Sequence, residues 1–149
     1  MKLIKSILIC LLGAFFYLAI GWFVFAYCLG AYSAAHTTSL IGFKKSETSL
    51  SVSFLFLSCL AYAIIIFYLQ QLSVVKSARG AVLQAALIGL LIAMMTDFYW
   101  YGTSTFYTGF TAVLVDLVAA FISVGLLGGF MFGVKSLLLP FSSSPNPRS

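Results

Sequence analysis

The sequence predicts an all-α polytopic membrane protein in which four transmembrane helices form one bundle and both termini are cytoplasmic. Hydrophobic residues make up 62% of the 149 residues, and only 8 basic and 3 acidic side chains are present. Such a chain has too little polar surface to coat a soluble globule, so lipid must be its solvent. A bilayer core requires about 20 apolar residues per helix, and the chain contains four runs of about that length.

The first apolar run covers residues 6–32 and has a competing interpretation as a cleaved secretory signal. Lys2 and Lys5 precede it, and SAAH at residues 33–36 offers small residues of the kind found at cleavage sites. A signal peptide has an apolar stretch of roughly 7–15 residues, whereas this run continues for about 25 and carries aromatic residues throughout. We therefore expect an uncleaved first helix.

Three further apolar runs cover residues 50–72, 81–100 and 110–134. Each is far longer than the 9–11 residues of a membrane β-strand and shows no sustained alternation. The backbone groups must therefore be satisfied within each segment, as they are in a helix. The polar stretch HTTSLIGFKKSETS, residues 36–49, is the expected loop between the first two helices.

The distribution of basic residues predicts the orientation of the helices. With a cytoplasmic N-terminus, Lys2, Lys5, Lys76, Arg79, Lys135 and Arg148 lie inside, and only Lys44 and Lys45 lie outside. This bias is usual in membrane proteins, and it explains the formal charge of +5 without nucleic-acid binding, which requires a clustered basic stripe. We expect one membrane domain over residues 1–140 and a disordered cytoplasmic tail over residues 141–149, because the tail's Ser, Pro and Asn bury little apolar surface.

Asp97 lies near the end of the third run, directly before a dense aromatic stretch. Steps of four back from it reach only small residues, which share its helix face: Ala81, Ala85, Gly89 and Ala93. Membrane helices approach each other closely at such small-residue faces. We therefore expect Asp97 to face protein, where a carboxylate needs a hydrogen-bond donor or a proton.

Asp116 lies below the outer end of the fourth run, at a depth similar to that of Asp97. At 1.5 Å per residue, both acids fall within roughly 10 Å of the outer interface. If they meet, they share a proton or a cation, because two close carboxylates do not both ionise without raising one pKa. The alternative is that each acid separately binds a loop amide or a neighbouring hydroxyl.

Three aromatic residues, Tyr99, Trp100 and Tyr101, follow Asp97 and have two interpretations. Amphipathic rings at headgroup depth form the usual aromatic belt, and the same rings are also suited to the wall of a ligand site. His36, after the first helix, is a further candidate ligand-binding residue, although a lone loop histidine is more often a solvated surface residue. Because it belongs to no HxxxH or HExxH pattern, we expect no metal site.

The sequence contains no complete catalytic or cofactor motif. Cys10, Cys28 and Cys59 are isolated and form no CxxC redox pair. A nucleophile elbow and a Walker loop are also absent. We therefore expect no cofactor, and we favour a protein without enzymatic activity over an enzyme.

The fourth run carries a second packing signal. In the stretch GLLGGFMFG, Gly125, Gly129 and Gly133 recur at steps of four, a pattern that permits close contact between membrane helices. At 100° per residue, Gly125 points half a turn away from Asp116. The glycine face either packs inside the bundle or contacts a second copy or another membrane protein.

The last two helices, residues 81–134, resemble the C-terminal hairpin of a family of small four-span bacterial inner-membrane proteins of unknown function. The motifs that carry the resemblance are MTDF before the aromatic loop and VLVDL after it, so Asp97 and Asp116 are the matching positions. The chain departs from the family at Tyr99 and Trp100, where a Thr-Asn pair is expected, and it lacks the family's acid in the first helix. The resemblance implies a four-span fold and no particular activity.

Three classes of function are consistent with these features. We favour a small structural or partner-binding four-span protein, because the glycine repeat provides a face for assembly. The alternative is a protein that binds or transports a small solute or cation at an outward-facing carboxylate pair. A membrane enzyme acting on a lipid-like substrate is the third and least supported class. The small size and short basic N-terminus favour a multi-pass protein of a bacterial inner membrane.

Overall fold

The computed structural model describes residues 2–38, 51–73 and 75–139, and these residues are almost entirely helical. The elements in chain order are α1 (Lys2–Gly21), the π-helix η1 (Trp22–Cys28), α2 (Gly30–His36), α3 (Val52–Leu72), α4 (Ala78–Thr103) and α5 (Phe110–Leu138). Within the described ranges the chain forms no strand beyond one isolated β-bridge. The predicted all-α fold is therefore confirmed. The predicted loop over residues 36–49 and tail over residues 141–149 fall largely or wholly outside the described residues.

Four helical segments are long and apolar enough to cross a bilayer, so the chain is a multi-pass membrane protein. These are Leu3–Cys28, Val52–Leu72, Ala78–Thr103 and Phe110–Leu138. The third begins three residues before its predicted start because Ser77 caps it, its hydroxyl accepting a hydrogen bond from the Gly80 N–H at 3.1 Å. The first is not one regular helix, since its α-helical geometry ends at Gly21 and a π-helix follows.

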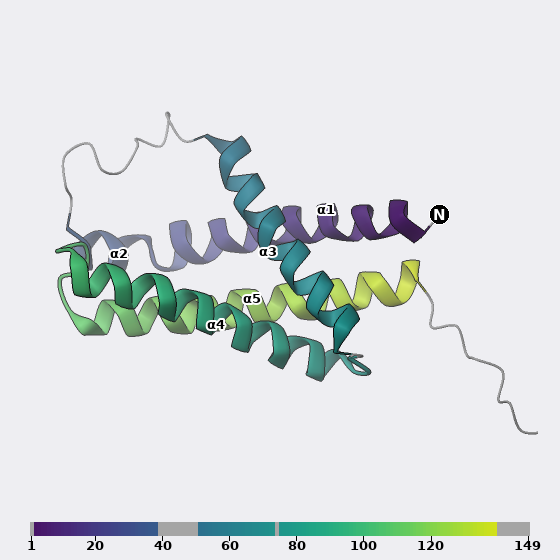
Figure 1. Ribbon diagram of the computed structural model, residues 1–149. Coiled ribbons are helices and arrows are strands. Elements are labelled where there is room, and N and C mark those ends of the chain that lie inside the picture. The colour runs from purple at the N-terminus through teal and green to yellow at the C-terminus, as the bar shows by residue number, and fades with distance from the viewer. Residues whose placement is uncertain (1, 39–50, 74, 140–149) are drawn as a thin grey trace, which may run out of the picture.

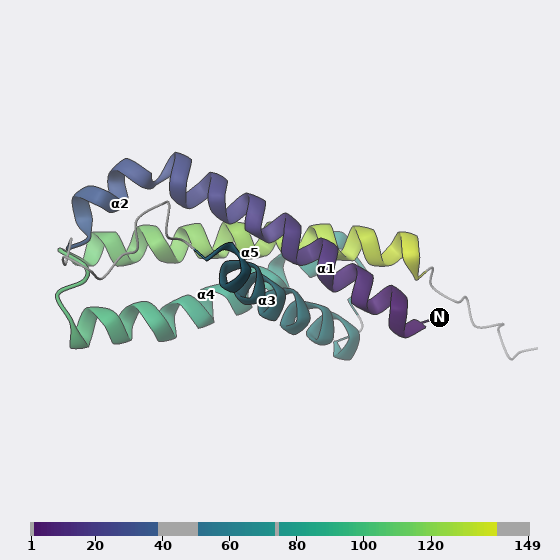
Figure 2. The same cartoon turned by 90° about the horizontal axis from the view of Figure 1, so that it is seen from above.

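Three of the four spans share one long axis, and the remaining span crosses them. α4 and α5 lie side by side as an antiparallel hairpin, and α1 runs along α5 in the opposite direction (Figure 1). α3 crosses obliquely and packs mainly on α1 (Figures 1 and 2). The N-terminus of α1 and the C-terminal end of α5 therefore lie at the same end of the molecule.

Small residues allow α4 and α5 to approach closely. Ala81, Ala85, Gly89 and Ala93 are all buried in α4. A Cβ atom at Gly89 would meet the Val124 side chain at 2.5 Å, and one at Gly128 would lie 2.2 Å from the Ala85 Cβ. The backbones of the two helices are therefore in contact at positions where only glycine fits.

The predicted glycine face is divided between this contact and the surface. Cβ atoms at Gly125 and Gly129 would approach Val82 of α4, whereas nothing lies within 4 Å of one at Gly133. Gly128, one residue outside the four-step pattern, makes the closest approach of the four. Most of the glycine face is thus used inside the chain.

Beyond Gly21, the first span leaves the path of α5. η1 has no buried residue, and the Leu29 N–H closes its last turn by donating to the Val24 carbonyl at 2.8 Å. Figure 2 shows α1 and η1 diverging from α5 and the short helix α2 turning back towards it. π-Helical turns often occur at functional sites, and here the turn places α2 over the start of α5.

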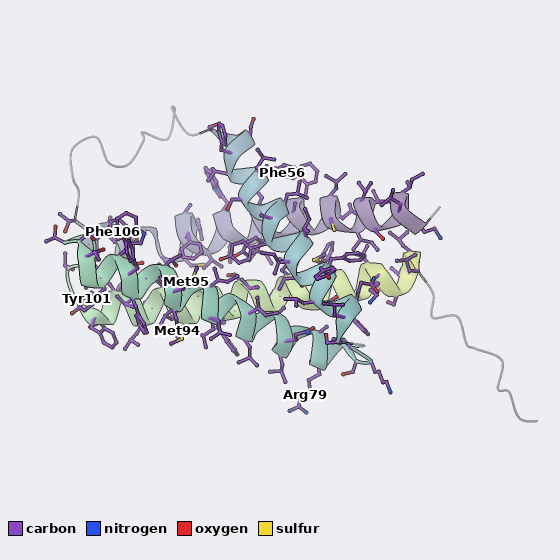
Figure 3. All side chains as sticks on the ribbon, in the orientation of Figure 1. Phe56, Arg79, Met94, Met95, Tyr101 and Phe106 are labelled. Atoms are coloured by element: carbon purple, nitrogen blue, oxygen red, sulfur yellow. The ribbon has the colours of Figure 1, made fainter. Side chains whose placement is uncertain are left out.

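Among the described residues, the two ends of the molecule differ in charge. Lys5 Nζ donates to the Leu138 carbonyl at 2.8 Å, and Lys135 Nζ donates to the Gln70 carbonyl at 3.4 Å, so basic residues cap the ends of α5 and α3. Arg79 lies at this same end (Figure 3). Both described acids, Asp97 and Asp116, lie in the part of the hairpin nearer the opposite end.

The contact between α4 and α5 predicts a large difference between two identical substitutions in α5. Gly128→Ala should destabilise the protein by about 1–3 kcal/mol, because the added methyl group overpacks against Ala85. Gly133→Ala, where the space is open, should be neutral or stabilise by up to about 1 kcal/mol through its higher helix propensity. Thermal unfolding of both variants in one detergent measures the difference, and equal stabilities would contradict the close contact.

Candidate functional site

The acids of α4 and α5 meet through one tyrosine. Tyr107, in the loop between the two helices, places its hydroxyl oxygen 2.8 Å from Asp116 Oδ2 and 3.1 Å from Asp97 Oδ1. Both distances are those of hydrogen bonds. The three side chains form a carboxyl–phenol–carboxyl triad near the end of the hairpin.

Backbone pairing between α2 and the α4–α5 loop holds Tyr107 in place. Thr37 and Tyr107 form an antiparallel β-bridge. The Thr38 N–H donates to the Phe106 carbonyl at 2.8 Å, and the Thr108 N–H donates to the His36 carbonyl at 3.0 Å. The Thr108 hydroxyl donates to the same carbonyl at 3.0 Å. The end of α2 and the α4–α5 loop, about 70 residues apart in sequence, are thus bonded to each other through the two residues that flank Tyr107.

The number of hydrogens in the triad limits its charge. The phenol has one hydrogen and donates fully to one acceptor. Burial is the main reason that the pKa of Tyr107 is raised far above its usual value, with the hydrogen bond and charge of Asp116 adding to it, so the phenol stays protonated. If the shorter contact is its donation to Asp116, the contact to Asp97 is a hydrogen bond only when Asp97 itself carries a proton and donates. The arrangement therefore fits one neutral and one ionised carboxyl group.

The surroundings of the two acids support this assignment. Asp97 is 7% exposed, and its Oδ2 atom is buried with no hydrogen-bond partner among the described residues. Its Oδ1 atom receives only a long contact, 3.4 Å from the Thr96 hydroxyl, besides that of Tyr107. An unpaired buried charge is costly, so the proton belongs on Asp97. Asp116 is half-buried and has more access to solvent than Asp97.

A small apolar cluster lies beside the triad. Ala93, Val113 and Leu117 form a buried cluster, and the Tyr107 ring packs against it. These residues come from α4 and α5, the two helices that carry the acids. The triad is therefore packed against apolar side chains of its own two helices.

Asp116 opens onto a cavity of about 330 Å³ between α5, the end of η1 and α2. Its polar lining includes His36, Ser33 and Thr37 as well as the triad's Tyr107 and Asp116. Aromatic rings supply much of the remainder, namely Phe25, Tyr32 and Phe106. The cavity thus combines one carboxylate with several aromatic faces, a combination suited to a cation.

His36 is oriented within this wall. Its Nδ1 atom lies 3.0 Å from the Tyr32 carbonyl oxygen, and its ring stacks on the Tyr32 ring at 4.1 Å between centroids. Because a carbonyl only accepts, Nδ1 carries a hydrogen, and in the neutral ring Nε2 is then an acceptor. The structure thus brings His36 and Asp116 to one cavity, although they are 80 residues apart in sequence.

The predicted aromatic wall lies elsewhere. Tyr99, Trp100 and Tyr101 are 62%, 42% and 43% exposed, and none of them lines the cavity. Tyr101 instead contacts the Phe110 ring edge-on at 5.7 Å, near the end of the hairpin at which α4 and α5 are joined (Figure 3). Their positions fit the interpretation as an aromatic belt. Phe25, Tyr32 and Phe106 line the cavity in their place.

Tyr107 is the residue that sequence reasoning missed. It is one of eight tyrosines, and nothing in its neighbours distinguishes it. Its role depends on pairing with Thr37, a contact between distant segments. The available signal was its position between the two acids, ten residues after Asp97 and nine before Asp116.

The donor set is not that of a metal centre. Within the described ranges, no three His, Cys, Asp or Glu side chains are grouped so that they could hold a metal ion. Cys10, Cys28 and Cys59 are free thiols in the structure. The chemistry available at the triad is therefore proton sharing and electrostatic attraction of a cation.

No protein-family model, curated protein or solved structure significantly matches this chain. The resemblance of residues 81–134 to a four-span family stays a prediction, and the function must be argued from the site itself.

The triad predicts that the two acids are coupled through Tyr107. We expect the double variant Asp97→Asn/Asp116→Asn to differ from the sum of the single variants by about 0.5–3 kcal/mol in unfolding free energy, because the two sites share one partner. The same cycle in a Tyr107→Phe background is the control, since the shared donor is gone and the coupling should shrink. Thermal unfolding of all eight proteins in one detergent measures both cycles. Additive single effects with Tyr107 present would mean two independent acids.

Proposed function

We propose that this protein binds a small organic cation, such as an amine or a quaternary ammonium ion, in the outer cavity beside Asp116. The single observation that carries the proposal is the opening of the Asp116 carboxylate onto the cavity of about 330 Å³. That volume lies at the small end of the range for ligand pockets, roughly 300–1,000 Å³. Asp116 is the one carboxylate in the described lining of the cavity, which suits a monovalent ligand.

The aromatic lining favours an organic cation over a hydrated ion. A cation over an aromatic face gains about 0.5–2 kcal/mol, more where water is excluded. Phe25, Tyr32 and Phe106 line the same cavity as the carboxylate of Asp116. The Ser33 and Thr37 hydroxyls and the His36 ring add hydrogen-bond acceptors for an ammonium group.

Binding is better supported than transport, enzymatic activity or assembly. Transport would require a polar path through the bundle, and among the described residues only Gln70 and Ser123 are buried polar residues besides Asp97. No residue in the described part of the cavity is an activated nucleophile. Assembly through the glycine face has only Gly133 open, because Gly125 and Gly129 already approach α4.

The proposal includes an orientation. We propose that both termini are cytoplasmic, that the membrane is a bacterial inner membrane, and that the cavity faces the exterior. The gathering of Lys5, Lys135 and Arg79 at the end opposite the triad supports this, because basic residues favour the cytoplasmic side.

Reporter fusions test the orientation. A reporter that is active only in the cytoplasm should function when fused after Ser149 and should fail when inserted at Lys44. A reporter that requires export should show the reverse pattern. Export of the C-terminal fusion would contradict the outward placement of the cavity.

The binding proposal predicts that cation affinity depends on Asp116 and not on Tyr99 or Tyr101. Tetramethylammonium should bind the protein in zwitterionic lipid nanodiscs, and Asp116→Asn should weaken its affinity at least tenfold, equivalent to about 1.4 kcal/mol, because the charge is removed. Tyr99→Ala and Tyr101→Ala, which lie outside the cavity, should not change it. Isothermal titration calorimetry against empty nanodiscs measures the affinities. Equal affinity of the wild type and Asp116→Asn would contradict the proposal.

A further inference from the structure

An apolar groove continues from the cation cavity along the face of α5 that is open to lipid. The groove has a volume of about 390 Å³ and lies between η1 and α5. Leu29 and Val115 line both the cavity and the groove, so the two spaces adjoin. A cavity with one carboxylate thus lies beside an almost wholly apolar groove.

The path of the first span creates this groove. η1 has no buried residue and diverges from α5 (Figure 2), which leaves the side of α5 uncovered by the described residues at this level. The uncovered side carries Leu114, Val118 and Ile122 at steps of four, and these are 46%, 58% and 52% exposed. Residues at this spacing form one stripe on a helix. The groove floor is therefore an aliphatic strip that is open sideways to the bilayer.

The combined shape identifies a class of ligand. We infer that the ligand is a single-chain cationic amphiphile, whose ammonium head lies beside Asp116 and whose alkyl chain lies in the groove over Val118 and Ile122. This inference rests on the proposed cation site and names the kind of molecule that it takes. Two observations support it: the carboxylate of Asp116 is complementary to an ammonium head, and the groove adjoins the cavity, with which it shares Leu29 and Val115.

The dimensions agree with a chain of moderate length. From Val115 to Ile122 the groove follows seven residues of helix, which is about 10 Å at 1.5 Å per residue and is comparable to roughly eight extended methylene groups. An amphiphile already dissolved in the outer leaflet would reach the site sideways, through the open edge of the groove. The membrane then supplies the ligand at the depth at which Asp116 lies.

Filling the groove tests the inference separately from the cation site. Val118→Trp and Ile122→Trp place a bulky ring in the groove on positions that are already exposed, so the fold should tolerate them. We expect both variants to weaken dodecyltrimethylammonium binding at least tenfold and to leave tetramethylammonium binding unchanged. Leu91→Trp is the matched control, because Leu91 is 64% exposed on α4 and lines neither space. Calorimetry in identical nanodiscs cancels the partition of the long-chain probe into lipid.

The outcomes distinguish the two proposals. If Asp116→Asn weakens both probes but neither tryptophan variant weakens the long-chain probe, the cation site stands and the amphiphile inference is wrong. If Asp116→Asn weakens neither probe, both are wrong. If Ile122→Trp, which lies two turns from the cavity, weakens both probes equally, the effect is not that of a blocked chain and the inference is also overturned.

Discussion

The hydrogen bonds of Tyr107 to Asp97 and Asp116 connect the parts of the molecule on which the candidate site depends. They join the ends of the two helices that carry the acids, and the β-bridge of the same residue to Thr37 joins those helices to the first span. The first span packs on α5 mainly through α1 and diverges from α5 towards η1, as Figure 2 shows. Without the pairing of Thr37 and Tyr107, α2 would have little to hold it over Asp116.

The contact between α4 and α5 sets the depth at which the acids meet. Lipid tails provide no hydrophobic force between helices, so close backbone packing must hold the hairpin together. Gly89 and Gly128 permit that packing because a methyl group at either would overlap the opposite helix. The hairpin is therefore fixed along its length, and Asp97 and Asp116 are held within reach of one phenol rather than brought together by their own attraction. Two carboxylates would otherwise repel each other.

Periodicity and hydropathy were sufficient to predict the four helices and the burial of Asp97, because both follow from local composition. The stripe Ala81, Ala85, Gly89 and Ala93 correctly indicated which face of α4 contacts protein. Features that depend on contacts between distant segments were not predictable in this way. The π-helix has no signal in WFVFAYC, the role of Tyr107 requires the partner Thr37, and Gly128 breaks the four-step pattern while making the closest contact.

The presence of one carboxylate in the described lining also determines which cations the cavity suits. A divalent metal ion such as Ca²⁺ takes about six to eight oxygen ligands and is usually held by several carboxylates. In the described lining, Asp116 is the one carboxylate, and its partner Asp97 is turned into the helix contact and suited to hold a proton. An organic cation spreads its charge over methyl or methylene groups. It therefore loses less hydration free energy than a metal ion on entering a cavity lined by Phe25 and Phe106. The single carboxylate, the aromatic lining and the adjoining aliphatic groove therefore all favour an organic cation with an apolar chain.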